Sequence, residues 1–119
     1  MVIRQGEVYW LDLGEPEGSR PGFRRPFVVV QNNVYNRGNI RTAVVCAVTG
    51  NPRRMLSPGN VLLEVGEANL KLESVVVVSQ LYTVNKSDLD ERIGTLSMIR
   101  VRQILDGVKL VLEPREVPA

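Results

Sequence analysis

No histidine occurs in this sequence of 119 residues, and Cys46 is its one cysteine. The absence of histidine removes the commonest general base and the commonest metal ligand. One cysteine allows neither an internal disulfide nor a thiolate zinc site. No phosphate-cradling glycine motif, Gly-x-Ser-x-Gly elbow or dinucleotide fingerprint is present either. If the protein is an enzyme, we expect it to work without a metal ion or a cofactor.

Long apolar runs are also lacking. No run approaches the roughly 20 residues of a membrane-spanning helix, and the N-terminus has no cationic region followed by a long apolar core. Aromatic residues make up only 5% of the chain, so Val, Leu and Ile must do most of the packing. Cys46 lies inside the apolar run 43–48, which is typical of a buried, inert thiol. We expect one cytoplasmic domain spanning residues 1–119.

Positive charge is abundant in one part of the chain. Residues 14–59 contain seven arginines and two glutamates, a balance of +5, whereas residues 1–13 carry −1 and residues 60–119 carry −2. The planar arginine side chain matches phosphate oxygens and stacks on bases. This distribution favours a nucleic-acid partner, and a solvated loop surface is the alternative. The acidic residues Asp88, Asp90 and Glu91 could offer oxygen ligands to Mg²⁺, but neighbouring cationic residues favour a solvated turn.

The apolar pattern predicts a mainly β protein with one helix. Strands are expected at 7–13, 27–31, 42–48, 60–65, 74–79 and 92–96, with 81–84 as a possible continuation. The stretch 32–41 contains four asparagines and Gly38, which suit a loop with tight turns and positive φ. Ser97 can cap a helix over 98–112, in which Gly107 costs about 1 kcal/mol relative to alanine. These elements indicate a small, curved antiparallel sheet or barrel with the helix packed against it.

Two polar residues stand at the ends of the predicted central strands. Arg25 precedes Pro26, which pushes it toward extended geometry, and Thr49 follows the strand 42–48. Arginine can stabilise the negative charge of a pentacovalent phosphorane, and threonine supplies a hydroxyl for hydrogen bonding. RNA brings its own nucleophile, the 2′-hydroxyl, whereas DNA would need an activated water. Cleavage by such residues would therefore favour RNA as the substrate.

Four motifs in order resemble the MazF/PemK/Kid family of toxin ribonucleases. They are residues 6–10 (GEVYW), 25–32 (RPFVVVQN), 47–49 (AVT) and 78–81 (VSQL). The resemblance implies a small SH3-like antiparallel β-barrel with a C-terminal helix, the fold shared by CcdB and PemK, and a homodimer. It also implies sequence-specific, metal-independent cutting of single-stranded RNA, notably mRNA, to 2′,3′-cyclic phosphate and 5′-hydroxyl ends. Its expected protein partner is a MazE-like antitoxin with an acidic, apolar tail.

In this family the arginine before the proline and the threonine that closes the third strand form the catalytic pair, which here are Arg25 and Thr49. Ser19 matches a loop serine near the active site, and Gln80 either braces the catalytic groups or ends a buried strand. Family members usually carry glycine where this chain has Phe23, a residue that could stack on a base. The other candidates for RNA contacts are Arg20, Arg24, Arg37, Arg41, Arg53 and Arg54.

Two other functions fit the same barrel. A gyrase-poisoning toxin binds a protein and cleaves nothing, and a non-catalytic RNA-binding barrel needs only positive charge. Neither requires an arginine and a threonine directed at one phosphate.

Overall fold

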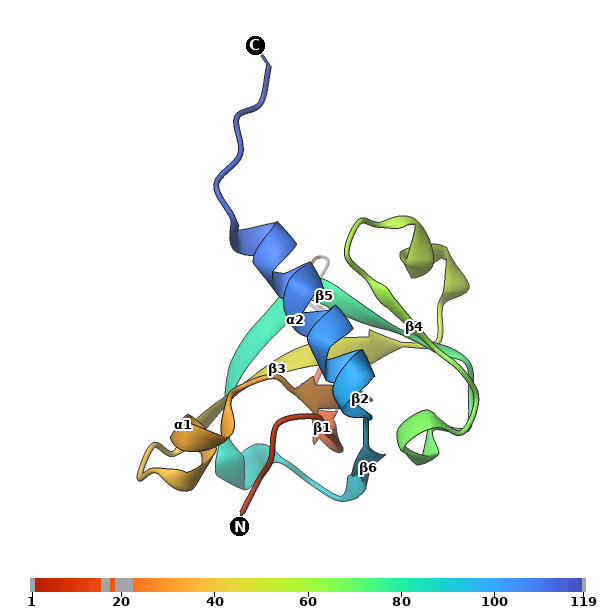
Figure 1. Cartoon of the computed structure of the whole chain (residues 1–119). Helices are drawn as coiled ribbons and strands as arrows, with labels where there is room; N and C mark the ends of the chain where they lie inside the picture. The colour runs from red at the N-terminus through yellow and green to blue at the C-terminus, as the bar shows by residue number, and fades with distance from the viewer. Residues whose placement is uncertain (1, 16–17, 19–22, 119) are drawn as a thin grey trace.

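The computed structural model describes residues 2–15, 18 and 23–118 and contains one six-stranded sheet. The strands follow the order β4-β5-β3-β2-β1-β6, and every neighbouring pair is antiparallel. Their bounds are β1 Glu7–Asp12, β2 Arg24–Val29, β3 Thr42–Thr49, β4 Val61–Leu63, β5 Ser74–Asn85 and β6 Arg92–Thr95. The helices are α1 Asn33–Arg37 and α2 Met98–Leu112, with short 3-10 turns η1 Pro52–Leu56, η2 Glu67–Asn69 and η3 Lys86–Asp88. Figure 1 shows α2 lying across the curved sheet.

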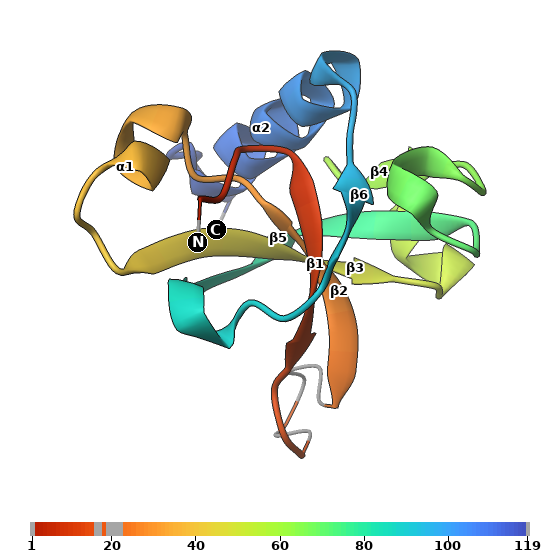
Figure 2. The same cartoon turned by 90° about the horizontal axis from the view of Figure 1, so that it is seen from below.

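A 3-10 turn covers part of one edge of the sheet. The side-chain amide of Asn69 in η2 donates to the carbonyl of Ile93 in β6 over 2.9 Å. A Cβ atom at Gly94 would lie 2.4 Å from the carbonyl oxygen of Ala68, so glycine permits this close approach. The turn after β4 therefore reaches the opposite edge strand, and the sheet bends into a half-barrel (Figure 2).

Both faces of the central strands are buried. In β2, Val28 packs into one core with Val101 and Ile104 of α2, whereas Phe27 and Val29 belong to a second core on the other face. This double burial explains why the β2 sequence is continuously apolar rather than alternating. Cys46 is fully buried in the first core, and this burial raises the pKa of its thiol to about 12. The prediction that Cys46 is buried is confirmed.

The mainly β architecture with a C-terminal helix is confirmed, and so is the helix start. Ser97 caps α2 by accepting a hydrogen bond from the Arg100 N–H over 3.3 Å. The expected continuation at 81–84 is also present, because β5 is a single strand of 12 residues.

The expected loop at 32–41 is wrong in its centre, where residues 33–37 form α1. Asn32 caps this helix by accepting from the Tyr35 N–H over 3.1 Å, so an asparagine that suggested a turn begins a helix instead. Gly38 has a φ of −73°, not the positive value expected. The second strand also begins and ends earlier than predicted. Beyond its end, the N–H groups of Val30 and Gln31 both donate to the Val44 carbonyl, and the Gln31 side chain donates to Asn36 and to the Thr42 carbonyl.

In the part of the chain that the structure describes, no helix has the length and apolar character needed to cross a membrane.

Candidate catalytic cavity

The pairing of β2 with β3 brings Arg25 and Thr49 together. Phe27 lies opposite Ala47 in this antiparallel pair. Continuing the register by two residues places Arg25 opposite Thr49 on the same face of the sheet. Side chains in such positions have Cβ atoms about 5 Å apart. Residues separated by 24 positions in the sequence can thus act on one substrate group.

Arg25 and Thr49 both line a small cavity of about 150 Å³. It is lined by Arg25, Ala47, Val48, Thr49, Asn51, Arg54 and Gln80. Four residues that the sequence suggested for catalysis, support or RNA binding therefore share it: Arg25, Thr49, Gln80 and Arg54. Two guanidinium groups in one cavity favour an anionic ligand such as a phosphate.

The hydroxyl of Thr49 makes a hydrogen bond with the segment that follows β3. Its oxygen accepts a hydrogen bond from the Asn51 N–H over 3.2 Å. The Asn51 side chain in turn accepts from the Arg53 N–H over 3.1 Å and caps η1, which begins with Pro52. Because the hydroxyl oxygen accepts here, its O–H remains able to donate a hydrogen bond to a substrate oxygen. Our reading of the sequence missed Asn51, although an Asn-Pro pair after a strand is a known turn signal.

Gln80 enters the cavity because β5 is irregular. Cys46 pairs with Leu81, but the next residue of β3, Ala47, pairs with Val77. Residues 78–80 thus have no counterpart in β3, and the strand bulges at this point. The bulge is adjacent to the cavity, where Gln80 contributes to the lining. It interrupts the regular alternation of β5 and brings the polar side chain beside Thr49 and Arg25.

A larger cavity of about 930 Å³ also has Arg25 in its lining. Its lining residues are Trp10, Phe23, Arg24, Arg25, Pro26, Val48, Gly50, Asn69, Leu70, Lys71, Leu72, Ser74, Glu91, Arg92 and Ile93. The guanidinium carbon of Arg24 lies 4.6 Å from the centre of the Trp10 ring, a cation–π contact, and Arg24 also pairs with Asp90 at 3.4 Å. Aromatic and cationic side chains thus meet beside Arg25. Trp10, Lys71 and Arg92 were not among the residues that the sequence suggested.

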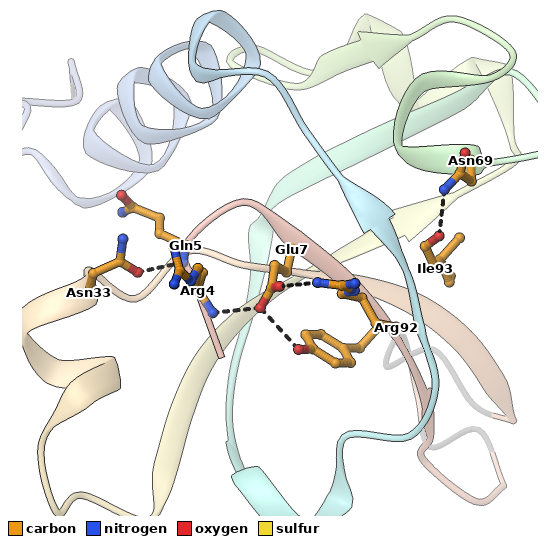
Figure 3. Close-up of polar contacts among 8 residues, drawn as sticks. Arg4, Gln5, Glu7, Asn33, Asn69, Arg92 and Ile93 are labelled. Carbon is orange, nitrogen blue, oxygen red and sulfur yellow. Dashed lines mark hydrogen bonds and ion pairs between the residues drawn. The ribbon is translucent and has the colours of Figure 1, made fainter. Parts of the chain in front are cut away.

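Arg92 is held at this larger cavity by a buried glutamate (Figure 3). Its guanidinium donates to Glu7 over 2.9 Å, and the Glu7 side chain is only 5% exposed whereas that of Arg92 is 59% exposed. Glu7 also accepts from the Arg4 N–H at 2.6 Å and from the Tyr9 hydroxyl at 3.0 Å. Burial and the bond to Glu7 raise the pKa of Tyr9 to about 12. Glu7 thus fixes an exposed cation at the rim of the cavity.

Phe23 adopts a backbone conformation that favours glycine. Its φ is +60°, and its side chain is largely exposed. The expected family pattern has glycine at this position, and here an aromatic residue adopts the positive φ. Phe23 belongs to the lining of the larger cavity.

The remaining candidates are placed differently. Arg53 is exposed on η1 beside Arg54. Arg41 precedes β3, whereas Thr49 ends it, a separation of eight residues or about 26 Å. Arg41 lines a separate cavity, and Arg37 ends α1, so neither lies at the cavity of Arg25 and Thr49. Ser19 and Arg20 lie outside the described residues. Residues 2–15, 18 and 23–118 contain no group of three or more Cys, Asp or Glu side chains placed to hold a metal ion.

A six-stranded half-barrel with a C-terminal helix is the fold of solved bacterial toxins. One is an endoribonuclease in complex with its cognate antitoxin from a mycobacterial species, with a TM-score of 0.77, 23% identity and coverage of 96% of this chain and 99% of that chain. Another is MazF from Deinococcus radiodurans, with the same score, identity and coverage.

The sequence identifies the family. Residues 4–112 match the model of the PemK-like, MazF-like toxins of type II toxin-antitoxin systems. The chain belongs to this family. It is 38% identical to "Endoribonuclease MazF6" of Mycobacterium tuberculosis over 113 residues, and this alignment covers 95% of this chain and 99% of the relative. It is 31% identical over 111 residues to "Endoribonuclease MazF" of Staphylococcus saprophyticus, covering 93% of this chain and 92% of the relative.

Proposed function

We propose that this toxin is an endoribonuclease that cuts single-stranded RNA, mRNA in particular, at specific sequences and without a metal ion. The observation that carries the proposal is the shared cavity of Arg25, Thr49 and Gln80. The two curated relatives named above as endoribonucleases, each matched over more than nine tenths of its length, support the same activity. Cleavage of mRNA would inhibit translation and growth.

The proposed chemistry uses the groups that line the cavity. The 2′-hydroxyl of the substrate attacks the adjacent phosphorus, the bond to the 5′-oxygen breaks, and the products carry a 2′,3′-cyclic phosphate and a 5′-hydroxyl. The 2′-hydroxyl loses a proton and the departing 5′-oxygen gains one. Arg25 binds the scissile phosphate and stabilises its added negative charge, and the Thr49 hydroxyl donates a hydrogen bond to a phosphate oxygen. Because a guanidinium keeps its charge at physiological pH, Arg25 is not the proton acceptor.

The larger cavity would bind the nucleotides next to the scissile phosphate. The Trp10 and Phe23 rings offer stacking surfaces to bases, and Arg24 and Arg92 offer positive charge to phosphates. Such binding depends on salt, because each neutralised phosphate releases counterions.

Protein partners follow from the family. We propose that the toxin is bound by a MazE-like antitoxin with an acidic, apolar tail, because the cationic cavities favour an acidic partner. We also propose that the toxin acts as a homodimer. Solved structures of related toxins contain a cognate antitoxin or MazE. We place the toxin in the cytoplasm, where mRNA is available, and treat residues 1–119 as one toxin domain, which the match over residues 4–112 supports.

The decisive experiment is incubation of the purified protein with a long single-stranded RNA in EDTA, with the fragment ends mapped chemically. Arg25→Ala and Thr49→Ala are tested in parallel, and Asn39→Ala serves as a control because Asn39 is exposed and remote from both cavities. We expect discrete cuts that end in cyclic phosphate, present in the control and lost in both cavity variants. Absence of cutting by a folded protein would refute the nuclease and favour a toxin that binds a protein target.

A further inference from the structure

Beyond the end of its pairing with β4, β5 has a backbone donor that a side chain satisfies. Val78 is the first of the three residues without a partner in β3. Its N–H donates to the side-chain oxygen of Asn60 over 3.0 Å. Asn60 directly precedes β4, whose last pairing with β5 on this side joins Val61 to Val76. The Asn60 amide thus replaces the backbone carbonyl that a longer β4 would have offered.

The other end of the same amide reaches the turn that carries Arg54. The Asn60 side-chain nitrogen donates to the carbonyl of Arg54 over 2.7 Å. Arg54 lies on η1 and lines the small cavity, as does Gln80 in the bulge. One side chain thus connects the two segments that carry Arg54 and Gln80, while Asn60 itself lines a different cavity.

The backbone next to Asn60 packs against α2. Gly59 has a φ of +82° and packs against Gly107 in the helix. A Cβ atom at Gly107 would lie 2.3 Å from the Gly59 carbonyl oxygen and 2.8 Å from a Val78 methyl group. The helix therefore packs closely against both the loop that contains Asn60 and the β5 bulge that Asn60 contacts.

We propose that Asn60 is a positioning residue for the catalytic cavity. Its side chain holds the Gln80 bulge and the Arg54 turn at the spacing that one scissile phosphate requires. The inference rests on the proposed function, since it takes the cavity of Arg25 and Thr49 as the place of RNA cleavage. Asn60 touches no substrate in this scheme. Its substitution should therefore slow the chemical step more than it weakens RNA binding.

The test compares Asn60→Ala with Asn33→Ala as a matched control. The Asn33 oxygen also takes part in two hydrogen bonds, from the Gln5 N–H at 2.8 Å and the Asn36 side chain at 3.1 Å, but it lines neither the small cavity nor the larger one. Cleavage of a short RNA that contains one mapped site is measured for kcat and KM. We expect Asn60→Ala to lower kcat by about 10-fold to 100-fold with KM changed less than about threefold. Asn33→Ala should leave both constants within about twofold of the parent.

A second variant and a second measurement cover the case in which Asn60→Ala does not fold. Asn60→Asp keeps an oxygen acceptor for Val78 but places a carboxylate oxygen against the Arg54 carbonyl, so we expect kcat to fall although the Val78 amide stays paired. Hydrogen exchange of the Val78 amide, followed by NMR, should be slow in the parent and in Asn60→Asp, and faster in a folded Asn60→Ala protein. Fast exchange of this amide in the parent would overturn the proposal.

Failure of the inference can be separated from failure of the proposed function. If Arg25→Ala and Thr49→Ala remain active, the catalytic cavity itself is wrongly assigned. If those two variants are inactive but a folded Asn60→Ala cleaves with the parent kcat, only the role of Asn60 is refuted. Equal losses in Asn60→Ala and Asn33→Ala would indicate a general effect on stability and would also refute it.

Discussion

Gly107 offers a test in which two physical effects oppose each other. It lies inside α2, where replacement of glycine by alanine should stabilise the helix by about 1 kcal/mol. The packing predicts the reverse, because the new Cβ would lie 2.3 Å from the Gly59 carbonyl oxygen and 2.8 Å from Val78. Real Cβ atoms essentially never approach a neighbour within 3.0 Å, so the helix or the loop must move.

The steric effect should dominate. The closest contact is a backbone atom, which cannot turn away as a side chain can, and Val78 is fully buried in the core. Overpacking of this kind costs up to about 3 kcal/mol, and the helical gain of about 1 kcal/mol offsets a third of it. We therefore expect Gly107→Ala to lower the free energy of unfolding by about 2 kcal/mol. The urea midpoint should fall by about 1 M for a protein of this size.

Urea unfolding can be followed by the fluorescence of Trp10, the single tryptophan. Lys109→Ala is the control, because Lys109 is an exposed residue of the same helix and its loss should change the free energy of unfolding by less than about 0.5 kcal/mol. A Gly107→Ala protein that is more stable than the parent would show that helix propensity outweighs the contact with Gly59. Our account of the close approach would then be wrong.

Phe23, Tyr9 and Glu67 each allow a test of one local interaction. Phe23→Gly should exceed Phe23→Ala in free energy of unfolding by about 1 kcal/mol, because both lose the ring but only alanine keeps an unfavourable positive φ. An alkaline titration followed by phenolate absorbance should show a step near pH 12 that Tyr9→Phe removes. Because the folded pKa of Tyr9 is raised, its contribution to stability is complete below about pH 10 and is lost toward pH 12. Glu67→Gln should cost about 1 kcal/mol at pH 7 by breaking the two-bond pair with Arg100. That pair lowers the pKa of Glu67, so the cost should shrink as the pH falls through the folded pKa.

Each of these tests has a contrary outcome. Equal stability of the two Phe23 variants would show that the positive φ causes no strain. A Tyr9→Phe protein that keeps the step near pH 12 would assign that step to another group. A cost of Glu67→Gln that is the same at pH 3 and pH 7 would show that the ion pair with Arg100 does not stabilise the fold. Protein shown to be folded at each pH by circular dichroism is the common control.

Features with a strong local signal were predictable from the sequence. The bounds of α2 followed from helical spacing and from Ser97, and both are present as expected. Arg25 and Thr49 flank two apolar segments, and because these segments pair as neighbouring antiparallel strands, their polar ends meet. The stretch around Asn32 shows the limit of such reasoning, since asparagine favours both turns and helix caps. Its four asparagines therefore did not distinguish α1 from a loop.

Features that depend on distant partners were not predictable. Arg92 belongs to the part of the chain with a net negative charge, so the charge distribution did not predict that it would lie at a cationic cavity. Its position at the larger cavity depends on Glu7, which precedes it by 85 residues. Gln80 was suggested only by the family resemblance, and nothing in the apolar run before it shows that three residues of β5 have no counterpart in β3. The register of two paired strands is a property of the pair, which neither strand's sequence states alone.

The position of Gly107 connects these two kinds of feature. Judged by local propensity, this glycine is a defect in an otherwise regular amphipathic helix. In the fold, it permits α2 to contact Gly59, and the next residue, Asn60, holds the bulge that brings Gln80 to Arg25 and Thr49. A residue that weakens the helix thus allows the packing beside the cavity. Where a sequence departs from the local optimum for its secondary structure, the cause is to be sought in a contact made by another element.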